Sequence, residues 1–252
     1  LRHDETDADR STLEFIAGIE TDLQWLGLDW DERVQQSDRP EAYGAAAETL
    51  RSKGRLYPCY ETPEELGLKR KTQLAAGRPP VYDRAALSLR SSEREAFEKE
   101  GRIPHWRFQL ESGRMGWADL VHGDMELDAE ALSDPVLIRE DGTPLYTLTS
   151  VVDDTEFAIT HVIRGDDHIA NTVPQIQLFT ALGSAAPAFA HLALLTGPGG
   201  ESLSKRLGSA SIESFRDQGL EALSVNSFLA RLGTSDPVEP RTSLDDIAAG
   251  FD

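Results

Sequence analysis

The chain has 252 residues, of which 39% are hydrophobic and 27% are charged, and its formal net charge is −19. This length suffices for one large domain or two modest ones. No apolar run approaches the roughly 20 residues of a bilayer-spanning helix, so we expect no transmembrane segment in this sequence. The charged N-terminus is unlike a secretory signal, and the single cysteine, Cys59, excludes an internal disulfide and a multi-cysteine zinc cluster, so we expect a reduced, cytoplasmic setting.

Helical and extended patterns alternate through the N-terminal part of the chain. In chain order we predict a helix over residues 12–26, a short strand over 28–30, a helix over 42–53 and an extended segment over 55–60. Ser11 is a suitable N-cap for the first helix, and Gly27 is a suitable stop. A further helix is predicted to begin at Thr62, where the threonine caps and Pro63 occupies the first turn.

The middle of the chain is rich in signals of antiparallel strands. After a charged helix over residues 91–99, we predict strands over 105–110, 115–120 and 135–139. Asp141-Gly142 is a strong hairpin signal between extended segments at 136–139 and 145–148.

Strands and helices alternate again in the C-terminal part. We predict an apolar strand over residues 157–163, a helix over 172–182, a second apolar strand over 189–195 and, after a glycine-rich loop, helical structure over 212–232. Pro174 falls in the first turn of the helix over 172–182, and Gly183 is its stop. The order of the elements predicts a parallel α/β sheet that is interrupted by an inserted domain.

The end of the strand over 157–163 delivers residues suited to an anionic ligand. Ligands of open α/β sheets bind beyond the carboxyl ends of the strands. Arg164 can grip a carboxylate or a phosphate with two hydrogen bonds, Asp167 can accept hydrogen bonds from a ribose, and the helix start that follows offers free N–H groups. The same residues can equally form an Arg–Asp pair that only caps the helix, and the pattern leaves both interpretations open.

A glycine-rich loop over residues 197–206 ends in two adjacent cations, Lys205 and Arg206. A lysine on such a loop can meet the negative charge that builds on a leaving pyrophosphate. The loop lacks the residue order of a Walker A motif. Taken alone, its pattern favours a solvent-facing loop.

The densest basic stretch of the chain consists of Lys69, Arg70, Lys71, Arg78, Arg84 and Arg90. On charge alone this stretch fits a solvated helix face. The net charge of −19 opposes bulk electrostatic binding of nucleic acid but leaves room for a local basic groove.

Two other groups of residues are candidates for chemistry. His161 and His191 lie within or beside strand patterns, where a histidine with satisfied hydrogen bonds is expected, and nothing has the spacing of a zinc site. The pair Asp153-Asp154 suits acid–base or Mg²⁺ chemistry. Adjacent side chains on a strand point to opposite faces, so at most one of the two is expected to face a site.

Taken together and in order, eight segments closely resemble bacterial glutamyl-tRNA synthetases of class I. They are LRHDETDADRST, QWLGLDWDE, PCYETPEEL, AAGRPPVYD, DPVLIREDGTPLYTLTSVVDD, ITHVIRGDDHIANT, LLTGPGGESLSKRLGS and FLARLGTSDPVEP. The resemblance favours glutamate over glutamine. It implies an α/β fold with a Rossmann-like, nucleotide-binding parallel sheet from residues 1–58 and 146–196, an inserted α+β acceptor-binding domain over 59–145, and the start of a helical stem-contact region over 197–252.

The resemblance implies ligation of glutamate to tRNA. In this reaction the glutamate carboxylate attacks the α-phosphate of ATP, which gives glutamyl-adenylate and pyrophosphate, and the terminal adenosine of tRNA(Glu) then accepts the glutamyl group. Mg²⁺ accompanies the ATP phosphates, and neither a permanent cofactor nor zinc is expected. We expect glutamate, ATP and tRNA(Glu) as partners, no membrane or DNA partner, and a cytoplasmic monomer.

The resemblance also assigns residues. Contacts to glutamate are expected from Asp4, Tyr146, Ser150 and Arg164, with Arg164 as the ionic partner. Contacts to ATP are expected from Asp167, His168, Leu203, Ser204 and Lys205. The expected catalytic residues are Lys205, which matches the second lysine of the KMSKS signature, and Arg206. Contacts to tRNA phosphates are expected from Lys69, Arg70, Lys71 and Arg78, which fall in the acceptor-binding insertion.

Several features depart from the family pattern. The chain starts with RHDETD where the family has RIEDTD, Ser150 replaces an asparagine and Ser202 replaces the first KMSKS lysine. The HIGH motif, expected ahead of residue 1, and the anticodon-binding domain are not in the sequence. Without HIGH the ATP phosphates lose histidine donors and a helix N-terminus, so we expect a catalytic-domain fragment with little or no activity alone.

Two alternatives remain open at this point. One is a glutamyl-queuosine tRNA(Asp) synthetase, a shorter relative that typically carries a zinc-binding cysteine cluster in the insertion, where this chain has only Cys59. The other is a non-catalytic tRNA-binding paralogue that kept the fold after losing HIGH. A HIGH motif shortly upstream of residue 1 would favour the enzyme over this paralogue.

Overall fold

Local sequence signals set the ends of several helices in the computed structural model, which describes residues 1–6, 11–197, 211–234 and 237–250. Helix α3 (Pro63–Ala75) begins with a capping box. In this box the Thr62 hydroxyl accepts the backbone N–H of Glu65 at 3.3 Å, and the Glu65 carboxylate accepts that of Thr62 at 2.8 Å. Helix α4 (Ser91–Lys99) has the predicted bounds.

The described residues form two units. Unit 1 comprises Leu1–Gln35 and Leu192–Asp252, and unit 2 comprises Gln36–His191. Unit 1 contains the parallel strands β1 (Arg2–His3) and β2 (Val34–Gln35) and the helices α1 (Leu13–Trp25), α7 (Ile212–Asp217), α8 (Ala222–Leu229) and α9 (Leu244–Ala249). The helical stretch expected over 212–232 is broken between α7 and α8 at Gly219, which has a φ of 79°. The predicted division into catalytic, inserted and stem-contact segments does not follow these two units and stays a prediction.

Two sheets form the framework of unit 2. A three-stranded antiparallel sheet has the order β3-β4-β7, formed by Leu56–Cys59, His105–Phe108 and Val136–Ile138. A mixed sheet has the order β6-β5-β9-β8, formed by Gly123–Asp128, Arg114–Asp119, Ala188–Leu192 and His161–Gly165. β5 pairs antiparallel with β6 and parallel with β9, where Asp119 lies opposite Phe189. Strands from the predicted insertion and from the predicted catalytic segment thus share one sheet.

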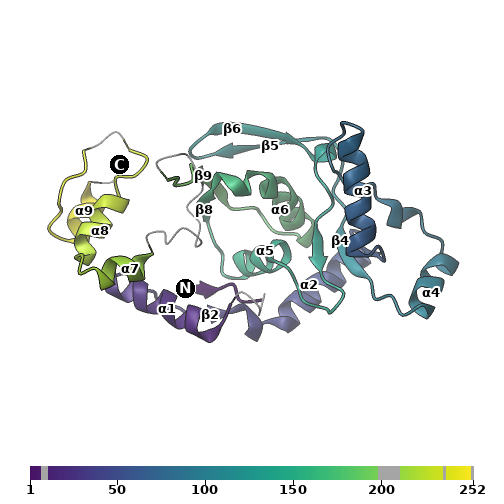
Figure 1. The fold of residues 1–252 in the computed structure, drawn as a ribbon, viewed down its shortest axis with the longest axis horizontal. Helices are drawn as coiled ribbons and strands as arrows, with labels where there is room; N and C mark the ends of the chain where they lie inside the picture. Colours follow the sequence, from purple (N-terminus) through teal and green to yellow (C-terminus); the bar gives the residue numbers. More distant parts are fainter. Residues whose placement is uncertain (7–10, 198–210, 235–236, 251–252) are drawn as a thin grey trace. The chain divides into compact units, whose positions relative to one another are not determined.

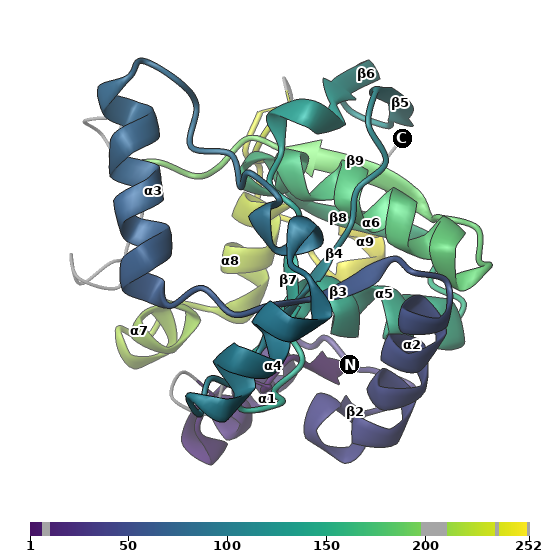
Figure 2. The same ribbon diagram turned by 90° about the vertical axis from the view of Figure 1, so that its right-hand side faces the viewer.

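Helices α2 (Pro40–Ser52), α5 (Tyr146–Glu156) and α6 (Ile169–Leu182) contact one another, and α6 lies beside strands β8 and β9 (Figure 1). The fully buried aliphatic and aromatic side chains of this core include Leu50, Phe108, Leu137, Leu148 and Leu178. Burial of each such side chain stabilises the fold by about 1.5–3 kcal/mol. Helix α3 has no buried residue and lies apart from α6 (Figure 2). The core therefore supports the α5, α6, β8 and β9 region.

The turn predicted at Asp141-Gly142 forms, but the prediction of a second strand after it is wrong. The N–H of Arg139 donates to the carbonyl of Thr143 at 2.9 Å. Pro144 makes a single bridge to β7 and has no N–H with which to continue a ladder. Helix α5 then begins at Tyr146.

Because α5 continues to Glu156, the strand predicted over 157–163 starts later, at the first residue of β8. Phe157 is the C-cap of α5. The pair Asp153-Asp154 lies on this helix, so the prediction based on opposite faces of a strand was wrong. Asp153 is fully buried.

Four smaller differences concern two short strands and two helix starts. Residues 28–30 form no strand. The N-cap of α1 is Thr12, whose hydroxyl accepts a backbone N–H, and not Ser11. Helix α6 starts at Ile169, so Pro174 lies inside it and not in its first turn. Strand β6 was missed because its residues, GDMELD, include no β-branched or aromatic side chain and only pairing with β5 stabilises it.

Candidate functional site

The side chain of Arg164, near the end of β8, lies among polar groups from three other elements. Its Nε–H donates to Nε2 of His191 on β9 at 3.1 Å, and Nη1 donates to Oε1 of Gln175 on α6 at 2.7 Å. Nη2 donates to the Thr172 hydroxyl at 2.8 Å, and Nη1 lies 3.4 Å from the Tyr146 hydroxyl on α5. Thr172, Gln175 and His191 are buried, so the guanidinium is held in one orientation.

No carboxylate touches Arg164 among the described residues. Its four partners are a histidine, an amide and two hydroxyls. A guanidinium has five N–H donors, and these partners accept four of them, which leaves one Nη2 proton for a ligand. A half-buried cation with a spare donor and no anionic partner is suited to bind a carboxylate or a phosphate.

Behind His191 lies Asp119, at the end of β5. Nδ1 of His191 and Oδ2 of Asp119 are 2.5 Å apart, and both side chains are fully buried. Oδ1 of Asp119 accepts the backbone N–H groups of Val121, His122 and His191 at 3.0, 3.1 and 3.2 Å. Burial alone raises the pKa of Asp119, but the hydrogen bonds from His191 and from these N–H groups outweigh it and hold the pKa well below its ordinary value. Asp119 is therefore an anion that accepts the Nδ1–H of His191.

The short helix η4 (Asp166–His168) carries two further predicted residues, Asp167 and His168, and places His168 next to Tyr146. The rings of Tyr146 and His168 meet edge to face, with centroids 5.6 Å apart. Nδ1 of His168 lies 3.1 Å from the amide nitrogen of Asn171, and Asp167 is exposed. The structure thus brings together Arg164 and Tyr146, predicted for glutamate, with His168, predicted for ATP.

The other predicted ligand contacts are placed differently. Ser150 is buried and accepts the amide N–H of Gln175 at 3.0 Å, so it reaches Arg164 only through that amide. Asp4 belongs to unit 1, where its carboxylate pairs with Arg2 at 2.7 Å. Outside the described residues lie Leu203, Ser204, Lys205 and Arg206. The roles of all these residues stay predictions.

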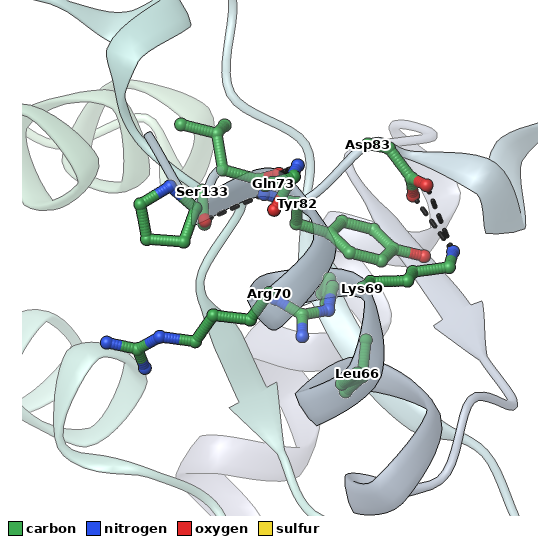
Figure 3. Close-up of a pocket in the computed structure, with 10 residues that line it drawn as sticks. Leu66, Lys69, Arg70, Gln73, Tyr82, Asp83 and Ser133 are labelled. Atoms are coloured by element: carbon green, nitrogen blue, oxygen red, sulfur yellow. Dashed lines mark hydrogen bonds and ion pairs between the residues drawn. The ribbon is translucent and has the colours of Figure 1, made fainter. Parts of the chain in front are cut away.

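The predicted tRNA-binding residues gather on or just after α3. Lys69 borders a hollow of about 170 Å³, and Figure 3 shows it reaching Asp83. Its ammonium pairs with Asp83 and with Glu61, each at 3.1 Å. Arg70, Lys71 and Arg78 are exposed and make no ion pair within the described part of the chain. Their charges are therefore available to phosphates, whereas the charge of Lys69 is already paired.

A histidine–aspartate pair ties the β5–β6 turn to η4. Nε2 of His122 lies 2.9 Å from a carboxylate oxygen of Asp166, and this hydrogen bond raises the pKa of His122 above its ordinary 6.5. A raised pKa means that the pair stabilises the fold fully below pH 6.5, and that this contribution is lost as the pH rises through the raised value. We expect an NMR titration to give a pKa above 6.5 for His122, and Asp166→Asn to lower it towards 6.5. A lower pKa of His122 in the wild type than in Asp166→Asn would contradict the hydrogen bond between His122 and Asp166.

No sequence pattern pointed to Asp119, Thr172 or Gln175 as site residues, and His191 was expected to be a histidine with satisfied hydrogen bonds. That expectation for His191 is confirmed, because the ring is buried between Asp119 and Arg164. These residues come from β5, β9 and α6, and only the order of strands in the sheet brings them together. No spacing along the chain signals such a group.

The parts of the chain that the structure describes do not support a metal site, a cysteine nucleophile or a membrane-spanning helix. These parts hold no group of three or more His, Cys, Asp or Glu side chains that could hold a metal ion. Burial raises the pKa of the Cys59 thiol to about 11, so it is no ready nucleophile. None of the described helices combines the length and the apolar character needed to cross a membrane.

The mixed sheet with its packed helices is an α/β fold, as expected for the catalytic domain of a class I synthetase. Residues 1–244 match the family described as tRNA synthetases class I (E and Q), catalytic domain, and the chain belongs to this family.

Several similar proteins are glutamate–tRNA ligases. The chain is 58% identical to a glutamate–tRNA ligase of Azospirillum brasilense and 59% identical to glutamate–tRNA ligase 1 of Parvibaculum lavamentivorans, and each alignment covers 100% of this chain and 57% of the relative. The crystal structure of a glutamate–tRNA synthetase from Elizabethkingia anophelis matches with a TM-score of 0.88 at 27% identity, over 100% of this chain and 58% of that one. The chain thus spans little more than half the length of these relatives. Nothing in the comparisons supports the glutamyl-queuosine alternative.

Proposed function

We propose that this chain is the glutamate-activating part of a glutamate–tRNA ligase. The observation that carries the proposal is Arg164, a half-buried cation at a strand end that has neutral partners and a spare donor. Membership of the family described as class I tRNA synthetases for E and Q supports an amino-acid carboxylate as the anion that Arg164 binds. A glutamate–tRNA ligase of Elizabethkingia meningosepticum, crystallised in complex with its amino acid, matches this chain with a TM-score of 0.85 at 27% identity.

In the proposed reaction Arg164 holds a carboxylate of glutamate by charge and by its spare Nη2–H. The Tyr146 hydroxyl, 3.4 Å from Nη1, borders the same position, and Ser150 acts through Gln175. Asp4 is proposed to meet the amino group of the substrate. The α-carboxylate then attacks the α-phosphorus of ATP, and the bond to pyrophosphate breaks. Fixed orientation of the two reactants accounts for much of the rate in such transfers.

ATP is proposed to lie along η4, with the Asp167 carboxylate accepting from the ribose hydroxyls and His168 lining the adenosine pocket. Mg²⁺ would enter bound to the ATP phosphates and would offset part of their negative charge. The loop residues Leu203 and Ser204 border the nucleotide, and Lys205 and Arg206 meet the charge that develops on pyrophosphate. In the second step a ribose hydroxyl of the terminal tRNA adenosine attacks the glutamyl carbonyl carbon and AMP leaves.

The acceptor end of tRNA(Glu) is proposed to contact the segment over residues 59–145. The available charges of Arg70, Lys71 and Arg78 make them the best-supported phosphate contacts, and the pairing of Lys69 makes it the weakest of the four. We also propose that the protein acts as a monomer in the cytoplasm.

The test is exchange of labelled pyrophosphate into ATP by the whole protein that contains this chain, with its tRNA present. We expect exchange with glutamate and none with glutamine or without amino acid. Exchange with glutamine but not with glutamate would overturn the choice of substrate. Binding of tRNA(Glu) without any exchange would overturn the catalytic role and favour the non-catalytic paralogue.

Lys205→Ala provides the matched inactive variant for this assay. Loss of one preorganised charge at the developing anion is expected to reduce turnover by about 10²–10³-fold. The affinity for ATP, measured in the absence of glutamate, is expected to change little. Unchanged exchange in this variant would contradict the role assigned to the loop.

A further inference from the structure

Three residues on three neighbouring strands form a continuous hydrogen-bonded line in unit 2. Asp119 ends β5, His191 lies on β9, and Arg164 lies on β8, in the order in which these strands stand in the sheet. The distances along the line are 2.5 Å from Asp119 Oδ2 to His191 Nδ1 and 3.1 Å from His191 Nε2 to Arg164 Nε. The line ends at the guanidinium that is proposed to bind glutamate.

We propose that Asp119 and His191 are positioning residues, which fix the orientation of Arg164 and keep its charge available to the substrate. This inference rests on the proposed function. The Nε–H of Arg164 can only donate, so Nε2 of His191 must present its lone pair and the ring proton must lie on Nδ1. Asp119 enforces that tautomer because its carboxylate accepts the Nδ1–H.

Hydrogen bonds also hold the ionised carboxylate of Asp119 in one position. Three backbone N–H groups donate to its Oδ1, from Val121 and His122 in the β5–β6 turn and from His191. The other face of the arrangement is closed by Phe189, whose ring stacks on His191 at 6.3 Å between centroids and lies 5.4 Å from Cζ of Arg164. The guanidinium can therefore neither turn nor slide without breaking a buried contact.

Because the imidazole of His191 lies between Asp119 and Arg164, the carboxylate does not compete with the substrate for the guanidinium. A carboxylate in direct contact with Arg164 would satisfy its charge and its donors, and the substrate would have to displace it. Here Asp119 compensates the half-buried cation of Arg164 through the imidazole of His191. The guanidinium keeps its spare donor and binds an anion in a defined direction, which is the arrangement that a rigid binding site needs.

Asp119→Asn in the whole protein tests the proposal. The variant keeps the oxygen that receives the backbone N–H groups but presents an amide N–H to His191, which then carries its proton on Nε2 and faces the Nε–H of Arg164 donor to donor. We expect the KM for glutamate to rise about tenfold or more, with the KM for ATP unchanged. Asp134→Asn is the matched control, because Asp134 is equally buried and accepts from Tyr57 and Arg84, away from Arg164.

The outcomes separate positioning from a merely structural role. Equal loss of kcat in both variants with an unchanged KM for glutamate would overturn the proposal. A second measurement needs no variant: ¹⁵N NMR of His191 in the wild type is expected to show Nδ1 protonated and Nε2 shifted by saturating glutamate. An Nε2-protonated ring, or no response to glutamate in a protein that charges tRNA, would also overturn it. If the wild type shows no glutamate-dependent pyrophosphate exchange, the proposed function fails. The tautomer of His191 still tests the hydrogen-bonded line from Asp119 to Arg164 in that case.

Discussion

Replacing Arg164 with alanine is expected to lower kcat/KM for glutamate by about 30-fold to several thousand-fold. The substrate carboxylate would lose a charged hydrogen-bond partner in a half-buried site, and truncation of one member of such a pair costs about 2–5 kcal/mol. The effect should appear in the KM for glutamate, because the contact exists before the transition state. The measurement is the rate of aminoacylation as a function of glutamate at saturating ATP and tRNA.

Two variants control this experiment. Arg164→Lys keeps the charge but loses the planar fork that donates to His191, Gln175 and Thr172 at once, so it should recover only part of the affinity. Arg114→Ala removes an arginine that is 73% exposed and pairs with exposed Glu126, and it should leave the kinetics unchanged. An unchanged glutamate dependence in Arg164→Ala, with the unfolding temperature preserved, would refute the assignment.

Local signals in the sequence predicted local structure well. The N-cap at Thr62, the helix over residues 91–99 and the stop at Gly183 each depend on a few neighbouring residues, and each is present in the structure. The prediction failed over residues 145–148. A strong turn before this segment suggested a returning strand, but burial of Leu148 against α2 and α6 favours a helix.

Some residues of the candidate site could likewise be predicted from short segments of sequence, whereas others depend on contacts between distant strands. Arg164 and Tyr146 could be named from short segments that resemble the family, and the structure places their side chains 3.4 Å apart. Asp119 could not be named in this way, because its relation to Arg164 depends on β5 lying beside β9 in the mixed sheet. Pairing between distant strands leaves no periodic trace in a sequence. The residues that orient a ligand-binding side chain are therefore harder to predict than that side chain itself.

Replacing Asp153 with alanine is expected to destabilise unit 2 by about 3 kcal/mol. Asp153 is fully buried on α5, and its carboxylate accepts from Gln36 at 2.8 Å, Arg39 at 2.9 Å and the Tyr43 hydroxyl at 3.0 Å. Without the carboxylate, the buried amide of Gln36 and the buried hydroxyl of Tyr43 lose this acceptor. The positive charge of Arg39 is then also less well compensated. The measurement is urea unfolding, in which the midpoint should fall and the slope should stay the same.

Glu156→Ala is the matched control for this prediction. Glu156 lies on the same helix and pairs with the same Arg39, but its side chain is 55% exposed. Solvent screens such a pair, so its loss should cost less than about 1 kcal/mol. Asp153→Asn should lie between the two, because the amide keeps one acceptor and fills the same space. If Asp153→Ala cost no more than Glu156→Ala, the buried carboxylate would not be what joins α5 to the segment from Gln36 to Tyr43.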